Sequence, residues 1–260
     1  MPILTLVLLL YPFEFFMHTN RLICFGLIAI GLLTACKDTS VQGPSFDPSG
    51  TYTVSATAQT GPVRMFTQAG EVQNAAIIRH FYQRQYSWVF PSSGAVLPFQ
   101  TAELTFTSPS EVTLNASTSM SGTLLSTSSP LTVSSQTSAR VVLTAKNLVW
   151  NRFPANPNRC DNVWRDIPGV STVYTCQTLA PGSGPASTLC EFKPVYVLNL
   201  HGKEARLATM SFIFSANANG RSCSMGSSDV FNVLNPTLPA RLTPGDTLVV
   251  QEAEFPLVRK

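Results

Sequence analysis

The chain has 260 residues, of which 44% are hydrophobic and only 12% are charged, so it can build one large folded domain or two small ones. Its formal net charge of +3 is too small and too scattered for a nucleic-acid-binding surface. No uninterrupted apolar run long enough to span a bilayer lies beyond the N-terminal region, which excludes a polytopic membrane protein.

The N-terminal region contains a segment with the form of a signal peptide. A short basic stretch begins at Met17 and ends at Arg21, and the uncharged apolar run 22–33 follows it. Such a run is too short to cross a membrane as a helix but is typical of a secretory signal. We expect residues 1–35 to be removed, with Met17 as the true start of translation.

The end of this segment, Leu33-Thr34-Ala35-Cys36, resembles the lipobox of bacterial lipoproteins. The resemblance implies that Cys36 becomes the first residue of the mature chain and carries acyl chains such as palmitate, which bind the membrane. Lys37 stands where an aspartate would favour retention in the inner membrane of Gram-negative bacteria. We therefore expect a lipid anchor in the outer membrane, with the protein facing the periplasm or the cell surface.

Residues 36–50 are rich in Gly, Pro, Ser and Asp, which disfavour regular structure, so we expect a flexible tether. Residues 51–260 then form a single β-rich domain. Alternating apolar and hydroxyl residues predict a strand at 51–57, and 63–67 is expected to pair back onto it. The opening Gly50-Thr51-Tyr52 is similar to the start of lipocalin-type barrels.

One amphipathic helix is predicted between these first strands and the rest of the sheet. Apolar residues recur at a spacing of four within 74–85, and Asn74 can cap the N-terminus. Alternating strands follow to the C-terminus, with a long strand at 139–150 and a hairpin formed by 194–200 and 205–215. About ten strands and one helix predict an antiparallel barrel or a strongly curved sheet, with a β-sandwich as the alternative.

The segment 151–192 interrupts this pattern, because it is rich in Pro, Asn and Gly and shows no alternation. It contains Cys160, Cys176 and Cys190, and Cys223 follows later in the chain. An even number of cysteines in an exported protein predicts disulfides, whereas zinc sites need closer spacing or nearby histidines, so no metal site is expected. We expect a loop stapled by disulfides, with the sequence neighbours Cys160–Cys176 and Cys190–Cys223 as the pairs.

The sequence contains no nucleophile elbow, zinc-protease motif or phosphate-binding loop, and no cofactor is indicated. The candidate catalytic pair is Glu252 and Glu254, which share one face of the last strand at a separation of about 7 Å. That separation would suit the two carboxylates of a glycoside hydrolase. The alternative is that both carboxylates lie on the solvent face, with Val249, Ala253 and Phe255 packed beneath them.

Four aromatic residues in and near the stapled loop form a candidate binding surface: Trp150, Phe153, Trp164 and Tyr174. Aromatic side chains dominate binding hot spots, but they can equally form a small core under the loop. We expect a non-enzymatic binding or structural module whose partner is a glycan, a hydrophobic ligand or an envelope protein. An envelope carbohydrate hydrolase that uses the two glutamates is the alternative.

Overall fold

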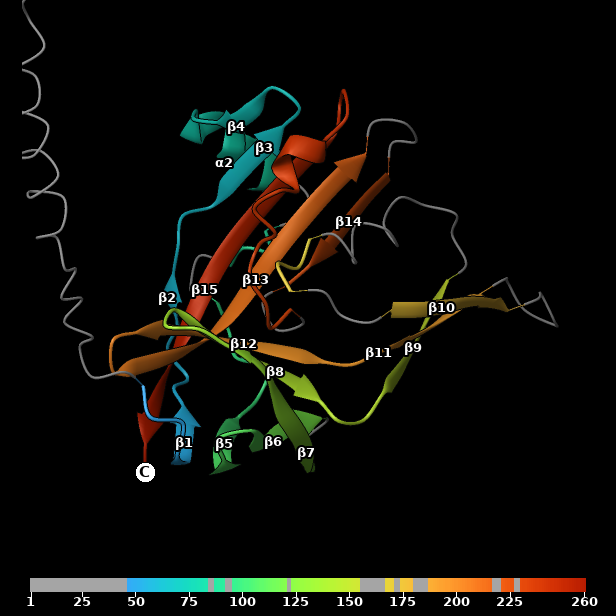
Figure 1. Ribbon diagram of the computed structural model, residues 1–260. Coiled ribbons are helices and arrows are strands. Elements are labelled where there is room, and N and C mark those ends of the chain that lie inside the picture. The colour runs from blue at the N-terminus through green and yellow to red at the C-terminus, as the bar shows by residue number, and fades with distance from the viewer. Residues whose placement is uncertain are drawn as a thin grey trace, which may run out of the picture. The chain divides into compact units, whose positions relative to one another are not determined.

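The structure is a computed structural model that describes residues 46–83, 87–91, 95–120, 123–154, 167–170, 174–179, 187–216, 221–226 and 230–260. The predicted signal peptide, Cys36, Cys160 and Trp164 lie outside these residues. Within them the fold is mainly β, with the single α-helix α2 (Ala75–Gln83). Figure 1 shows the strands and this helix.

Eight strands close into an antiparallel barrel. They are β1 (Gly50–Val54), β5 (Thr101–Ser108), β6 (Glu111–Met120), β7 (Thr123–Gln136), β8 (Arg140–Ala145), β12 (Val195–His201), β13 (Glu204–Ala216) and β15 (Thr247–Arg259). Each pairs with the next, and β15 pairs back onto β1. The predicted barrel is therefore confirmed, and the closing pair excludes the sandwich alternative.

Three insertions interrupt this up-and-down meander. Between β1 and β5 lie β2 (Gln59–Thr60), β3 (Arg64–Thr67), β4 (Gly70–Val72) and α2. Between β8 and β12 lie β9 (Val149–Pro154), β10 (Tyr174–Leu179) and β11 (Ser187–Phe192). Between β13 and β15 lie β14 (Arg221–Met225) and the 3-10 helix η2 (Pro239–Arg241).

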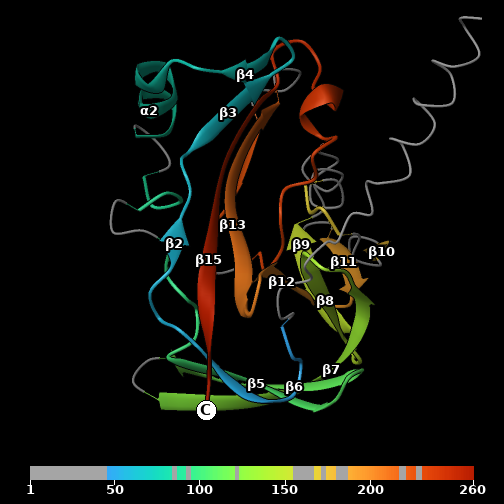
Figure 2. The same cartoon turned by 60° about the vertical axis from the view of Figure 1, so that its left-hand side comes forward.

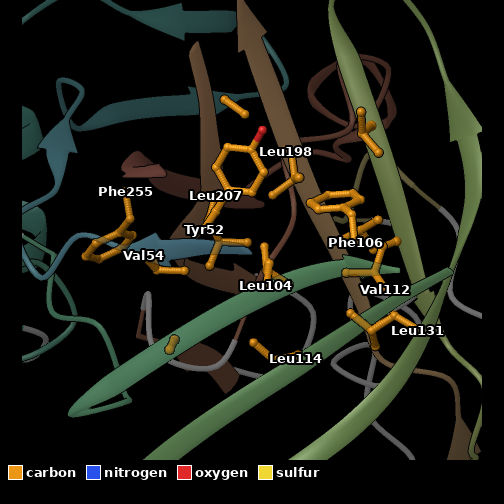
Figure 3. Packing of buried hydrophobic residues seen from close by; sticks show 14 of the residues in the cluster. Tyr52, Val54, Leu104, Phe106, Val112, Leu114, Leu131, Leu198, Leu207 and Phe255 are labelled. Atoms are coloured by element: carbon orange, nitrogen blue, oxygen red, sulfur yellow. The ribbon is translucent and has the colours of Figure 1, made fainter. Parts of the chain in front are cut away.

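The barrel interior is filled by apolar side chains, some of which are shown in Figure 3. Leu104, Leu131, Leu143, Leu207 and Phe255 are each at most 2% exposed. They come from five different strands and belong to one buried cluster on the inner face of the barrel. The period-two pattern in the sequence therefore produces a packed core inside the barrel.

An aromatic group packs at the start of β1. The rings of Phe46, Tyr52 and Phe106 lie with their centroids 5.3 to 6.0 Å apart, and the Tyr52 hydroxyl donates a hydrogen bond of 2.6 Å to the Asp47 carbonyl. Burial raises the pKa of this hydroxyl. Because Phe46 is only 4% exposed, the predicted tether 36–50 extends too far at its C-terminal end, and the folded domain already includes residue 46.

The ribbon formed by β13 and β15 extends beyond the barrel and continues the same hydrogen-bonded sheet (Figure 2). At that end β14 flanks β13, and β3 and β4 flank β15. One face of the ribbon packs Met210, Phe212 and Phe214 beneath Ile167, Val230, Leu238 and Leu242. The opposite face packs Ile213 and Val249 against Met65, Val89 and Phe90.

Helix α2 begins where the sequence predicts, because the Asn74 side chain accepts hydrogen bonds from the Ala76 and Ile77 amides at 3.0 and 3.3 Å. The partly buried Ile78, Phe81 and Tyr82 pack against the cluster that contains Ile213. The expectation that 63–67 pairs back onto 51–57 is wrong. Strand β3 pairs with β15 and β4, since both edges of β1 are already taken by β5 and β15.

The hairpin of β12 and β13 is confirmed, and its turn includes Gly202 at φ +67°, in the left-handed region that favours glycine. The single long strand predicted at 139–150 is instead two strands, β8 and β9, that belong to different sheets. The segment 151–192, which shows no alternation in the sequence, nevertheless contributes strands. Its β9, β10 and β11 form an antiparallel three-stranded sheet in which β11 is central.

Candidate functional site

The two candidate catalytic glutamates lie on one face of β15, as the alternation predicts. Glu252 stands opposite Met210 and Glu254 opposite Ala208 in the β13–β15 ladder. The intervening Ala253 is 3% exposed, and Val249 and Phe255 are fully buried on the other face. The predicted packing beneath the glutamates is therefore confirmed, but neither carboxylate is free, because each is held by groups from other segments.

Glu254 is the centre of a polar network on the outside of the barrel. Its Oε1 accepts a hydrogen bond of 2.7 Å from the Asn199 side-chain amide, and its Oε2 lies 3.0 Å from His201 Nε2. The Arg206 guanidinium approaches the same Oε2 at 3.5 Å. Because these partners come from β12 and β13, the carboxylate fastens three strands together.

Arg206 extends the network to a fourth strand. Its guanidinium also contacts the Gln59 side chain on β2 and lies 3.1 Å from the Glu204 carboxylate. The side chains of Arg206 and Glu254 are only 18% and 23% exposed, whereas that of Glu204 is 68% exposed. The buried Nε of Arg206 has no hydrogen-bond partner among the described residues. Glu204 and Glu254 thus both compensate this largely buried cation, and Glu254 is the less exposed of the two acids.

Glu252 binds a different segment of the chain. Its Oε1 accepts a hydrogen bond of 3.0 Å from the backbone amide of Leu234, in the chain that covers the ribbon. It also lines a small cavity of about 50 Å³ together with Gly61, Pro62, Arg64, Leu234 and Val250. A space of this size holds one or two water molecules at about 30 Å³ each and is too small for a sugar ring. Glu254 does not line it.

Arg64, which lines this cavity, forms an ion pair with another acidic residue. Its guanidinium donates two hydrogen bonds, of 2.8 and 2.9 Å, to Glu71 on β4, and it lies 4.8 Å from the centre of the Phe66 ring. The hydrogen bonds from Arg64 hold the pKa of the Glu71 carboxyl below its ordinary value. The cation is therefore placed to join β3 to β4 rather than to bind a substrate next to Glu252.

The candidate aromatic surface is only partly within the described residues. Trp150 and Phe153 lie on β9 and Tyr174 on β10. Tyr174 and Val149 both stand opposite Phe192 on β11. Trp164 lies outside the described residues, so the four-residue aromatic surface stays a prediction.

A shallow groove on the outer face of β5, β6 and β7 was not predicted. It has a volume of about 250 Å³, and it is lined by Thr101, Glu103, Asn115, Ala116, Ser117, Ser126, Thr127 and Ser128. The Thr101 and Ser117 hydroxyls lie 2.6 Å apart, and the Lys260 ammonium contacts the Glu103 carboxylate. The sequence signal was the serine- and threonine-rich stretch 117–138, which gives no sign of curvature by itself.

Among the residues that the structure describes, no three His, Cys, Asp or Glu side chains are grouped as metal ligands would be. No helix in the described part of the chain has the length and apolarity needed to cross a membrane. A comparison with models of known protein families, with curated proteins and with solved structures finds no match. The function therefore has to be argued from the chain's own residues.

Proposed function

We propose that this protein is a lipid-anchored lipoprotein of the bacterial outer membrane whose β-barrel domain is a non-enzymatic binding or structural module. The anchoring part rests on the lipobox-like sequence that ends at Cys36. The non-enzymatic part rests on one observation about the two glutamates. Glu252 and Glu254 are each satisfied by groups of their own chain, in two separate networks, which leaves no shared site for a glycosidic bond.

The packing of the barrel supports contact through the outer surface. Lipocalin-type binding of a hydrophobic ligand needs an open interior, whereas the interior of this barrel is occupied by buried side chains such as Leu104, Leu131 and Phe255. We therefore favour a glycan or an envelope protein as the partner over a hydrophobic ligand. The hydroxyl-lined groove on β5, β6 and β7 is a polar surface that fits such partners.

The anchor is tested by replacing the cysteine that would carry it. We expect the native protein extracted from membranes to start at Cys36 and to have the added mass of a diacyl or triacyl group, while Cys36→Ser is not acylated. Intact-mass analysis and membrane fractionation measure both. Cys24→Ser, within the predicted signal peptide, is the matched control and should be processed normally. A leader still attached, together with an unchanged location of Cys36→Ser, would end this proposal.

We further propose that the four remaining cysteines form two disulfides. Cys223 takes part in a disulfide bond, and Cys176 stands directly opposite Cys190 in the β10–β11 ladder. Directly opposed residues of antiparallel strands have Cα atoms about 4.5–5.5 Å apart, within the range that a disulfide spans. This register favours a Cys176–Cys190 bridge over the pairing of sequence neighbours and leaves Cys160 for Cys223.

Peptide mapping without reduction distinguishes the two pairings. We expect one cross-linked peptide pair that contains Cys176 and Cys190 and another that contains Cys160 and Cys223. Peptides that join Cys160 to Cys176 would restore the pairing of sequence neighbours. Four free thiols in protein purified from the envelope would contradict the disulfides altogether.

A further inference from the structure

Strand β7 is paired along both edges over only part of its length. Residues 123–132 pair with β6, whereas β8 covers only Leu131–Gln136. The pairing with β8 ends at Pro130, whose carbonyl accepts a hydrogen bond of 2.9 Å from the Lys146 amide. Alternate residues of a strand direct their N–H and C=O groups to opposite edges. Over 123–129, every second residue therefore presents backbone groups that find no ladder partner among the described residues.

This free edge lacks the features that usually protect a sheet edge from pairing. The whole stretch from Val112 to Ala139 contains no Lys, Arg, Asp or Glu. Pro130 and the register shift between Val133 and Ser135 both lie beyond the free segment. Natural edge strands are normally blocked by lysines, prolines or bulges within them. In the part of the chain that the structure describes, the edge at 123–129 is therefore open to another strand.

The side chains of the free segment are also exposed. Residues 123–128 are exposed on both faces, and Leu124 and Leu125, on opposite faces near the start of the strand, are 59% and 46% exposed. A strand added at this edge would cover both leucines while it satisfies the backbone. The segment thus offers an apolar contact in addition to hydrogen bonds.

We propose that the free edge of β7 is the interface at which two copies of this chain pair, antiparallel and about a two-fold axis. The absence of charge favours a second copy, because antiparallel self-pairing then opposes no like charges. A two-fold contact uses the same edge on both copies and leaves none free, so the assembly stops at two. Antiparallel pairing also sets the leucines of one copy near the serine and threonine end of the other.

The dimer would join two copies of the β5–β6–β7 sheet. The groove already described is lined on one side by Ser126, Thr127 and Ser128, which belong to the same segment of β7. Pairing along this edge therefore brings the two hydroxyl-lined grooves next to each other across the axis. A repeating polar partner could then contact both grooves at once, with the gain in avidity that two linked sites give.

The test is the oligomeric state of the full-length chain in a density-matched detergent, measured by sedimentation over about 1 µM to about 1 mM. We expect a reversible monomer–dimer equilibrium in this range, because a ladder of this length buries less than the roughly 800 Å² per partner of a standard interface. A chain that is monomeric throughout the range overturns the proposal. So does association beyond the dimer, since a two-fold contact closes.

A matched pair of variants locates the interface. Ser126→Lys places a charge on the free half of β7, and Ser135→Lys makes the same change on the half paired with β8. Both serines are exposed. We expect Ser126→Lys to weaken the dimer at least tenfold and Ser135→Lys to leave it unchanged. Equal affinity of the two variants overturns the proposal.

Amide hydrogen exchange of the unmodified chain gives a second test that needs no substitution. On going from dilute to concentrated protein, we expect slower exchange at alternate residues of 123–129. The amides of Leu131 and Thr132, which are already paired with both β6 and β8, should not change. Exchange at 123–129 that does not depend on concentration in a dimeric sample would place the contact elsewhere and overturn the proposal.

Discussion

Replacing Phe212 with alanine is expected to lower the free energy of unfolding by about 3–5 kcal/mol, as truncations of large buried side chains do. Phe212 is 1% exposed and stands opposite Val250 in the ladder that joins β13 to β15. Its ring packs in the cluster with Phe66, Leu248 and Leu238. Truncation removes that apolar area and leaves a cavity that a paired ribbon cannot close.

Urea titration of the domain measures this loss, and Val258→Ala is the control. Val258 lies on β15 too, but it is 60% exposed. We expect Val258→Ala to change stability by less than about 0.5 kcal/mol. Equally small effects of both substitutions would mean that the even-numbered residues of β13 do not face the chain that covers them.

Phe212 also illustrates what the alternation in the sequence can and cannot predict. The pattern correctly puts Met210, Phe212 and Phe214 on one face, because the side-chain period of a strand is two. It does not reveal that this face lies outside the barrel, beneath the segment that contains Val230 and Leu238. Both faces of β13 are buried in its central part, and local periodicity carries no information about which covering segment lies on which side.

Local sequence patterns predict the strands of the barrel but do not predict how the barrel closes or how its insertions fold. Strand existence follows from local patterns, and so do the helix cap at Asn74 and the turn at Gly202. Closure of the barrel depends on the pairing of β13 with β15, which are separated in sequence by β14 and η2. The sheet formed by β9, β10 and β11 was missed because its strands are rich in polar residues and lie in a segment rich in Pro, Asn and Gly, without the apolar alternation by which strands are recognised.

The sequence predicts only those features of the candidate site that the geometry of a single strand determines. The spacing of Glu252 and Glu254 correctly puts them on a common face. Their partners come from β12, β13 and the backbone at Leu234, all distant in sequence. A pair of carboxylates with catalytic spacing therefore cannot be distinguished from two structural acids until the neighbouring strands are placed.

The structural role of Glu254 leads to the second large effect. Glu254→Gln is expected to destabilise the domain by about 1–3 kcal/mol, because it removes the charge that compensates Arg206 and weakens charge-assisted hydrogen bonds. The figure is below that of a fully buried ion pair, since both side chains remain partly exposed to solvent. Thermal and urea unfolding of the variant measure the loss.

Glu204→Gln is the matched control, because Glu204 contacts the same guanidinium at 3.1 Å but is 68% exposed. We expect it to cost less than about 0.5 kcal/mol, as exposed ion pairs do. The comparison holds the substitution and the cation constant and changes the burial of the carboxylate, together with the contacts of Glu254 with Asn199 and His201. Equal losses would mean that solvent screens both pairs alike. A Glu254→Gln variant that keeps full stability would mean that the network does not fasten β2, β12 and β13 to β15, and the carboxylate would again be free for chemistry.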